Sequence, residues 1–165
     1  YAAASNSSSQ EILEKKIPTL VEQIGDAMKK LYQLGGRKFV IYNTGPLGYL
    51  PLISQRKEFF NTVARAFNKH LRLLSLKLRS QMTNAMIIYG DMYGIKLDLI
   101  TKYRQYGFKT ATVPCKVSPG IECGSIFWDE AHYSDAANKL VASKLWTGDH
   151  LSFNTSIRDL CNILI

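Results

Sequence analysis

Two short apolar runs, separated by one long amphipathic segment, constrain the fold of this chain more than any other feature. Residues 39–42 (FVIY) and 85–89 (AMIIY) are rich in β-prone side chains and are bounded by turn-forming residues. Between them, residues 57–81 repeat apolar side chains at helical spacing. Short apolar strands separated by long helices are typical of βαβ units. We therefore expect 39–42 and 85–89 to be neighbouring parallel strands, with 57–81 as the helix that connects them.

The rest of the chain adds helices but no further clear strand. Apolar spacing predicts these helices over residues 12–34, 92–100 and 135–146. Ser134 is placed to cap the last of them. Residues 1–11 read as a loose N-terminal segment and residues 147–165 as a C-terminal tail. Because doubly wound sheets have about five strands, residues 1–165 are predicted to form one partial α/β domain, incomplete at the N-terminus.

The net charge of +8 limits the classes of partner. Much of the positive charge lies in one stretch: Arg56, Lys57, Arg65, Lys69, Arg72, Lys77 and Arg79. A basic helix face of this kind is either solvated or in contact with phosphates. Because no RNP-like, zinc-finger or helix-turn-helix signature accompanies it, we expect no specific nucleic-acid partner. No apolar run approaches the ~18 residues of a membrane span, so we expect no transmembrane segment.

The cysteines bear on metal binding and on the redox compartment. The chain has three of them, Cys115, Cys123 and Cys161. Neither they nor any histidine shows zinc-ligand spacing, so no metal or cofactor is expected. Cys115 and Cys123 flank a loop containing Pro and Gly, and could form a disulfide in a secreted protein. Glycosylation sequons at Asn6 and Asn154 are consistent with secretion. The first residue is Tyr1, which we interpret as the start of a processed or truncated product.

The stretch FWDEAHYSDAAN (127–138) places Asp129 three residues before His132, just ahead of a helix start. In a serine-hydrolase triad, the carboxylate orients the histidine ring and the ring takes the proton of the nucleophile. A D-x-x-H spacing allows the carboxylate to reach Nδ1 within one turn. The spacing alone also occurs in surface loops, so both interpretations stay open at this point. His70 is expected on the surface of a helix, and His150 in TGDHLS is taken as coincidental.

Five ordered blocks resemble a known family. They are LYQLGGRKFVIYNTGPLGYLP, the FN of the long helix, IIYGDMYGIKLDLI, YGF at 106–108 and FWDEAHYSDAANKLVASKL. Together they are similar to the C-terminal portion of a plant GDSL-type esterase/lipase of the SGNH hydrolase superfamily. The resemblance implies a flavodoxin-like three-layer α/β/α sandwich with a parallel sheet. It also implies that His132 is a general base and that Asp129 orients it. The family's Gly-Asp-Ser nucleophile, its oxyanion glycine and its Gly-x-Asn-Asp asparagine are not in this chain.

The chain departs from the family pattern in its loops. Tyr49 stands where the family commonly has a cysteine, and residues 50–57 are too short for the loop that carries a second one. The resemblance therefore implies that both halves of one disulfide are absent together. The family's Cys-Cys-Gly after YGF is reduced to Cys115-Lys116, and the loop before FWD is short. Because that loop often shapes the substrate cleft in the family, the resemblance implies no particular substrate range.

Three functions from different classes remain. The first is a secreted esterase or lipase that acts on an acyl-ester small molecule or lipid, seen here as the portion carrying Asp129 and His132. Its nucleophile would come from a partner chain or a segment that supplies the N-terminal half. The second is a truncated, non-catalytic binding or accessory protein of the same family. The third is a basic module that associates with nucleic acid.

Overall fold

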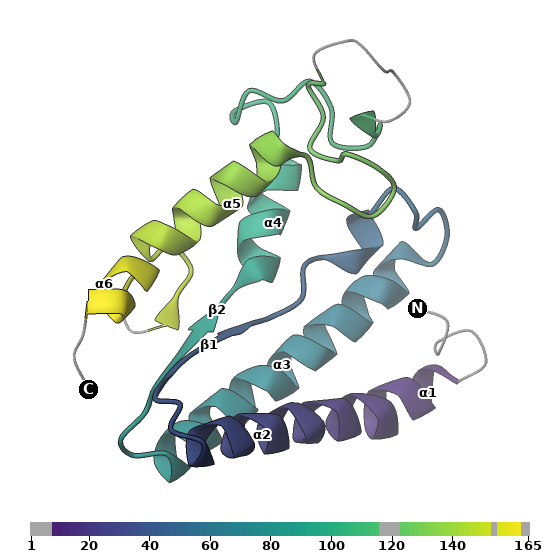
Figure 1. Cartoon of the computed structure of the whole chain (residues 1–165). Helices are drawn as coiled ribbons and strands as arrows, with labels where there is room; N and C mark the ends of the chain where they lie inside the picture. The colour runs from purple at the N-terminus through teal and green to yellow at the C-terminus, as the bar shows by residue number, and fades with distance from the viewer. Residues whose placement is uncertain (1–7, 116–122, 153–154, 163–165) are drawn as a thin grey trace.

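Two parallel strands, β1 (Lys38–Tyr42) and β2 (Met86–Gly90), form the sheet in the computed structural model, which describes residues 8–115, 123–152 and 155–162 (Figure 1). Phe39 lies opposite Ile87 in the parallel register. The predicted parallel pairing is therefore confirmed. β1 begins one residue earlier than predicted and β2 is shifted by one residue, because hydrogen bonding, not composition, sets the ends of a strand. The sheet has two strands within the described ranges, as expected of part of an α/β domain.

Helix α3 (Lys57–Gln81) connects the strands and lies beside α2 (Ile17–Gln33) on one side of the sheet (Figure 1). Both helices turn a stripe of apolar residues toward the strands. The resulting core joins Met28, Ile41, Leu71, Leu78, Met82, Ile87 and Tyr89. Ile41 and Tyr89 are opposite in the register, so the same face of both strands contributes to this core. This shared core fixes the two strands against α2 and α3. Because the strands are parallel, their carboxyl ends lie side by side at one edge of the sheet.

The first helical segment contains a π-helical turn. It begins with α1 (Ser9–Glu11), continues through η2 (Ile12–Lys16) and runs into α2. Pro18 lies in the first turn of α2, where its lack of an N–H and the bulk of its ring disturb the regular ladder. A π turn just before it accommodates that break. The helix therefore begins inside the 1–11 segment that was expected to be loose.

A glycine pair ends α2 and turns the chain toward β1. Gly35 has φ of +99°, in the left-handed region that glycine adopts without strain. The amide of Gly36 donates to the carbonyl of Leu31 at 2.9 Å, and the amide of Gly35 donates to that of Tyr32 at 3.0 Å. This bonding pattern is a Schellman motif, which satisfies carbonyls at the helix end.

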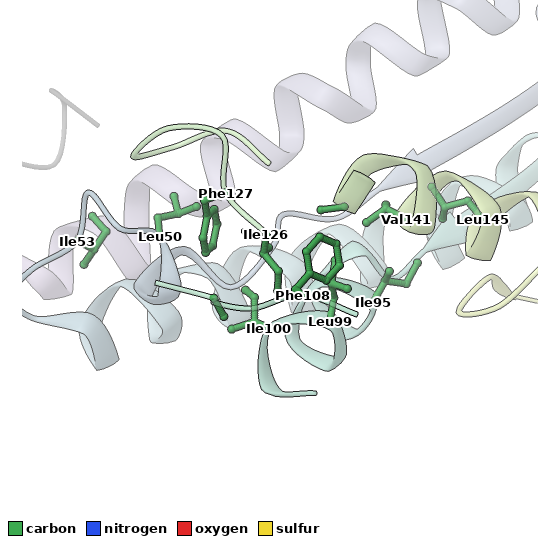
Figure 2. Close-up of a cluster of buried hydrophobic side chains, with 12 residues drawn as sticks. Leu50, Ile53, Ile95, Leu99, Ile100, Phe108, Ile126, Phe127, Val141 and Leu145 are labelled. Atoms are coloured by element: carbon green, nitrogen blue, oxygen red, sulfur yellow. The ribbon is translucent and has the colours of Figure 1, made fainter. Parts of the chain in front are cut away.

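A second core lies on the other side of the molecule, where α4 (Met92–Thr101) packs against α5 (Asp135–Thr147) (Figure 1). Figure 2 shows its side chains, which come from both helices and from the loops that contain Leu50, Phe108, Ile126 and Phe127. The Ser134 hydroxyl accepts from the amide of Ala137, which confirms the predicted helix cap. This core carries the loop of Asp129 and His132.

Short elements complete the fold. The 3-10 turn η3 (Leu47–Tyr49) is held to α3, since the amide of Gly48 donates to Asn61 Oδ1 at 2.8 Å. Helix α6 (Ile157–Asn162) lies in the predicted tail and packs against α5. None of the helices in the described part is both long and apolar enough to cross a bilayer.

A disulfide joins Cys115 to Cys123, whose Cα atoms are 5.4 Å apart. The amide of Cys115 donates to the carbonyl of Phe127 at 2.9 Å, so this bridge is attached to the second core. The pairing left open from the sequence is therefore present. Both sequon residues, Asn6 and Asn154, lie outside the described residues.

Candidate active site

Asp129 and His132 lie at the tip of a small loop whose base is built into the second core. The amide of Trp128 donates to the carbonyl of His132 at 2.8 Å, and Phe127 and Tyr133 form an antiparallel bridge. The rings of Phe127 and Tyr133 pack with their centroids 5.0 Å apart. Because the two ends of the loop are joined in this way, its polar tip has a defined position on an apolar base.

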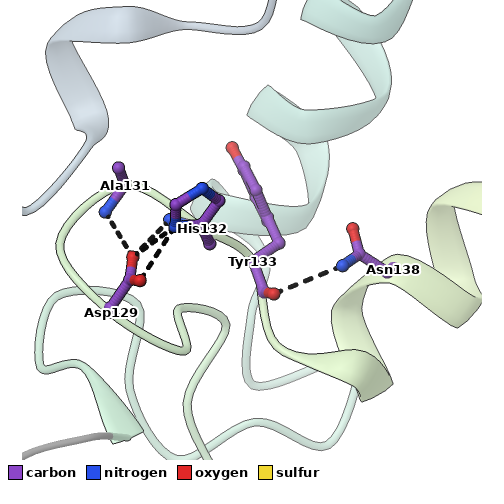
Figure 3. A network of polar contacts seen from close by, with 5 residues as sticks. All are labelled: Asp129, Ala131, His132, Tyr133 and Asn138. Atoms are coloured by element: carbon purple, nitrogen blue, oxygen red, sulfur yellow. Dashed lines mark hydrogen bonds and ion pairs between the residues drawn. The ribbon is translucent and has the colours of Figure 1, made fainter.

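The Asp129 carboxylate organises the tip of this loop (Figure 3). Its Oδ1 accepts from the amides of Ala131 at 2.8 Å and His132 at 2.7 Å, while Oδ2 lies 2.8 Å from His132 Nδ1. The Ala131 N–H, then the His132 ring and the His132 N–H, lower the pKa of Asp129 from 3.8 to about 2. The carboxylate is therefore ionised at neutral pH and held in one orientation.

The His132 ring is fixed at one nitrogen and open at the other. When Nδ1 carries the proton, it donates to the carboxylate, and the lone pair of Nε2 is left to accept a proton. The side chain is 78% exposed, and no residue in the described part hydrogen-bonds to Nε2. The predicted contact between the carboxylate and Nδ1 is thus confirmed. The arrangement can orient an imidazole and move a proton, as a general base requires.

Two hollows flank His132. One is lined by Pro51, Leu52, Thr112 and Pro114, together with the 129–132 loop. The amide of Leu52 donates to the carbonyl of Glu130 at 2.9 Å and joins the two walls. The rim of this hollow is largely apolar, and no serine or cysteine lines it among the residues described.

The other hollow reaches the carboxyl end of β1. Its lining includes Thr44, Lys96, Tyr133 and Asn138. The ammonium of Lys96 lies 4.4 Å from the centre of the Tyr133 ring, a cation–π contact. Burial lowers the pKa of Lys96 and raises the pKa of Tyr133. In both cases burial disfavours the charged form of the side chain. Serine and cysteine are likewise missing from its described lining.

The structure also assembles polar residues that the sequence analysis left apart. Asn43 follows β1 and Asp91 follows β2, and Asn43 Nδ2 donates to Asp91 Oδ1 at 2.8 Å. His150 Nδ1 lies 3.9 Å from Asp91 Oδ2, beyond hydrogen-bond distance. Their signal in the sequence is a polar residue within two positions of the end of each predicted strand, where parallel sheets collect functional groups. His70 lines a different hollow, between α2 and α3.

Within the part of the chain that the structure describes, no group of three or more His, Cys, Asp or Glu side chains is arranged to hold a metal ion. The loop itself presents a carboxylate and an imidazole in hydrogen-bond contact.

Comparisons with known proteins identify the family that the chain resembles. The family model described as GDSL-like Lipase/Acylhydrolase matches residues 3–145. Two relatives from Arabidopsis thaliana are GDSL esterase/lipase LIP-4, 36% identical over 87% of this chain and 46% of the relative, and GDSL esterase/lipase At1g09390, 34% identical over 89% and 48%. Alpha-L-fucosidase 3 from the same plant is 30% identical over 84% of this chain and 48% of its own length.

The chain spans about half the length of the curated relatives that it matches. The match covers both strands, their connecting helix and the Asp129–His132 loop. It confirms the resemblance stated from the sequence, and with it the interpretation of the fold as an incomplete α/β sandwich. The chain belongs to the GDSL-like lipase/acylhydrolase family, among the plant GDSL esterases/lipases.

Proposed function

We propose that this chain supplies the acid–base part of a carboxylic ester hydrolase. The observation that supports this most directly is the 2.8 Å contact between Asp129 Oδ2 and His132 Nδ1, beside an exposed ring. In acyl transfer, Nε2 of His132 takes the proton of a serine hydroxyl as that oxygen attacks the ester carbonyl. Asp129 keeps the ring in the correct tautomer and stabilises the imidazolium. His132 then returns the proton to the departing alcohol.

The nucleophile in this proposal comes from polypeptide outside residues 1–165. The sequence has no Gly-Asp-Ser and no Gly-x-Asn-Asp block. β1 pairs with β2 along one edge, and its other edge has no strand beside it in the described ranges. An open strand edge presents unpaired N–H and C=O groups that a further strand can satisfy. A segment of the same polypeptide or a partner chain carrying the N-terminal half would dock there and bring the serine toward His132.

The substrate proposed is an acyl ester, either a small molecule or a lipid. Its support is the apolar rim that Pro51, Leu52 and Pro114 form next to His132. We also propose that the protein is secreted. The Cys115–Cys123 disulfide supports this, because structural disulfides persist in oxidising compartments.

A chimaera tests this function. The N-terminal half of one of the relatives, which carries a Gly-Asp-Ser block, is fused to residues 1–165, and hydrolysis of short acyl esters is measured. We expect hydrolysis by the chimaera, and a loss of several powers of ten on His132→Ala. His70→Ala is the matched control, since His70 lies on α3 away from the loop. Activity that survives His132→Ala, with the control equally active, would refute the assignment.

The chain by itself is expected to hydrolyse esters no faster than free imidazole. No serine lines the two hollows beside His132 within the described part. The family's oxyanion glycine and asparagine are also not in these 165 residues, and the loss of oxyanion donors lowers the rate by a further factor of about 10²–10³. A fluorophosphonate probe reports an activated serine directly. Labelling of the isolated 165-residue chain, abolished by His132→Ala, would show that the nucleophile is internal after all.

The alternative is a non-catalytic binding or accessory protein of the same family, for which the apolar rim of the hollow beside His132 offers a binding surface. It predicts that the chain binds acyl esters at the Leu52–Pro114 hollow without turnover. Saturation-transfer NMR with a short-chain ester measures this binding. Binding by the chain, together with a chimaera that folds but remains inactive, would favour this alternative over the hydrolase.

A further inference from the structure

A further hollow, with a different character, lies between α3 and the carboxyl end of β2. The segment around 150–152 runs beside β2 on the edge away from β1, where Gly90 and Leu151 form an antiparallel bridge (Figure 1). The amide of Asp91 donates to the carbonyl of His150 at 2.9 Å, and that of Tyr89 donates to Ser152 Oγ at 2.9 Å. These bonds close one wall of a hollow of about 620 Å³ that contains no residue of the 129–132 loop.

The lining of this hollow is strongly basic. Its cationic side chains all come from α3 and are Arg65, Lys69, Arg72 and Arg79. Their spacings of four, three and seven residues place them on one face of the helix. One carboxylate, that of Asp91, lines the described part of the hollow. Its Oδ1 accepts from Asn43 Nδ2 at 2.8 Å and from the amide of Gly94 at 3.0 Å, and, among these described residues, the carboxylate forms no ion pair with any of the four cations.

Two of the four cations are engaged within the fold. Arg79 donates from Nε to the Ile87 carbonyl and from Nη2 to Ser152 Oγ, each at 2.7 Å. It therefore fixes the wall of the hollow. Arg65 is paired with Glu58 and donates to the Tyr93 hydroxyl at 3.3 Å. Arg65 and Arg79 therefore shape the hollow, and the cations between them on α3, Lys69 and Arg72, are the ones that can contact a ligand.

Lys69 and Arg72 differ from these two. Neither side chain has a hydrogen bond or an ion pair with any residue of the described part, and both are exposed at the hollow. Burial is the main cause of the lowered pKa of Arg79, and the positive charge of Arg72 is the second cause. Arg72 and Arg79 are therefore close enough for their positive charges to repel each other. An anion in the hollow would relieve that repulsion.

We propose that this hollow binds a phosphate group, with the Arg72 guanidinium and the Lys69 ammonium as its principal donors. A guanidinium presents two parallel N–H donors that match two phosphate oxygens, and an ammonium adds a second, compact charge. The phosphate belongs either to a soluble phosphate monoester or to a monoester lipid headgroup such as that of phosphatidic acid, since both present the same dianionic group. The site shares no residue with the Asp129–His132 pair, so the two proposals stand or fall separately.

The test uses two phosphate probes and two double variants of the 165-residue chain. The probes are glycerol 3-phosphate, titrated by calorimetry, and phosphatidylcholine vesicles with and without phosphatidic acid, measured by co-flotation. Lys69→Gln with Arg72→Gln removes the proposed donors. Lys57→Gln with Lys77→Gln is the matched control, because it removes the same charge from α3 at positions that do not line the hollow. Glutamine keeps a comparable helix propensity, and circular dichroism checks the fold.

We expect the Lys69/Arg72 double variant to weaken binding about tenfold or more, and the control double variant to change it less than about twofold. Binding of glycerol 3-phosphate would identify a soluble ester, and binding of phosphatidic acid vesicles alone would identify a headgroup. Equal losses in both double variants would overturn the proposal, since net charge alone would then explain them. Failure to bind either probe would also overturn it. Preferential binding of duplex nucleic acid, weakened equally by both double variants, would do the same.

Discussion

Replacement of Phe127 by alanine should destabilise the fold and loosen the Asp129–His132 loop together. The Phe127 side chain is 0% exposed in the second core, and its ring packs on Tyr133. An aromatic side chain of this kind buries at least ~150 Å² of apolar surface, which at ~25 cal/mol per Å² is about 4 kcal/mol. Measured substitutions of buried Phe by Ala cost about 3–5 kcal/mol, in agreement with this value. We therefore expect the free energy of unfolding to fall by about 3–5 kcal/mol.

Urea denaturation followed by circular dichroism measures this change, provided that unfolding is two-state. The matched control is Trp128→Ala at the next position, where the side chain is 54% exposed and should lose less than about 1 kcal/mol. If Phe127→Ala unfolds the chain outright, Phe127→Leu remains measurable and should cost roughly 1–2 kcal/mol through lost ring packing. An equal cost for Phe127→Ala and Trp128→Ala would refute the claim that the loop is built on this core.

Two further predictions concern the same region. The lowered pKa of Asp129 means that its hydrogen bonds stabilise the fold fully above pH 3.8, and that this contribution is lost as the pH falls toward about 2. In the His132→Ala variant, the pKa of Asp129 should be higher than in the native chain but still below 3.8, because the hydrogen bond from the Ala131 N–H, the largest cause of the lowered pKa, remains. Carboxyl ¹³C NMR measures this pKa, and a value at or above 3.8 would contradict the prediction. Replacing Cys115 and Cys123 by serine should lower the free energy of unfolding by about 2–3 kcal/mol, since the bridge spans eight positions of sequence. Cys161→Ser, at an exposed free cysteine, is the control, and a loss of similar size there would exclude a specific effect of the bridge.

Much of the candidate site could be predicted from the sequence because its contacts are local. Asp129 and His132 are three residues apart, so one tight turn brings the carboxylate to both the ring and the amide of His132. The strand–helix–strand unit was predictable for a similar reason, since apolar periodicity within each segment specifies its secondary structure. The six-residue helix α6 was missed because it is too short to show a period and depends on the packing of Leu160 against its neighbours.

Only the tertiary structure decided what surrounds these local features. The hollow beside His132 depends on the hydrogen bond from the Leu52 amide to the Glu130 carbonyl. The proposed phosphate site depends on α3 lying against a segment more than seventy residues away in sequence, as the hydrogen bond from Arg79 to Ser152 shows. The basic residues of α3 were visible in the sequence as a face, but the wall that makes them a site was not. Such contacts depend on how two apolar cores pack and on which loops they bring together. No local propensity encodes that packing, because its free energy comes from burial shared between distant segments.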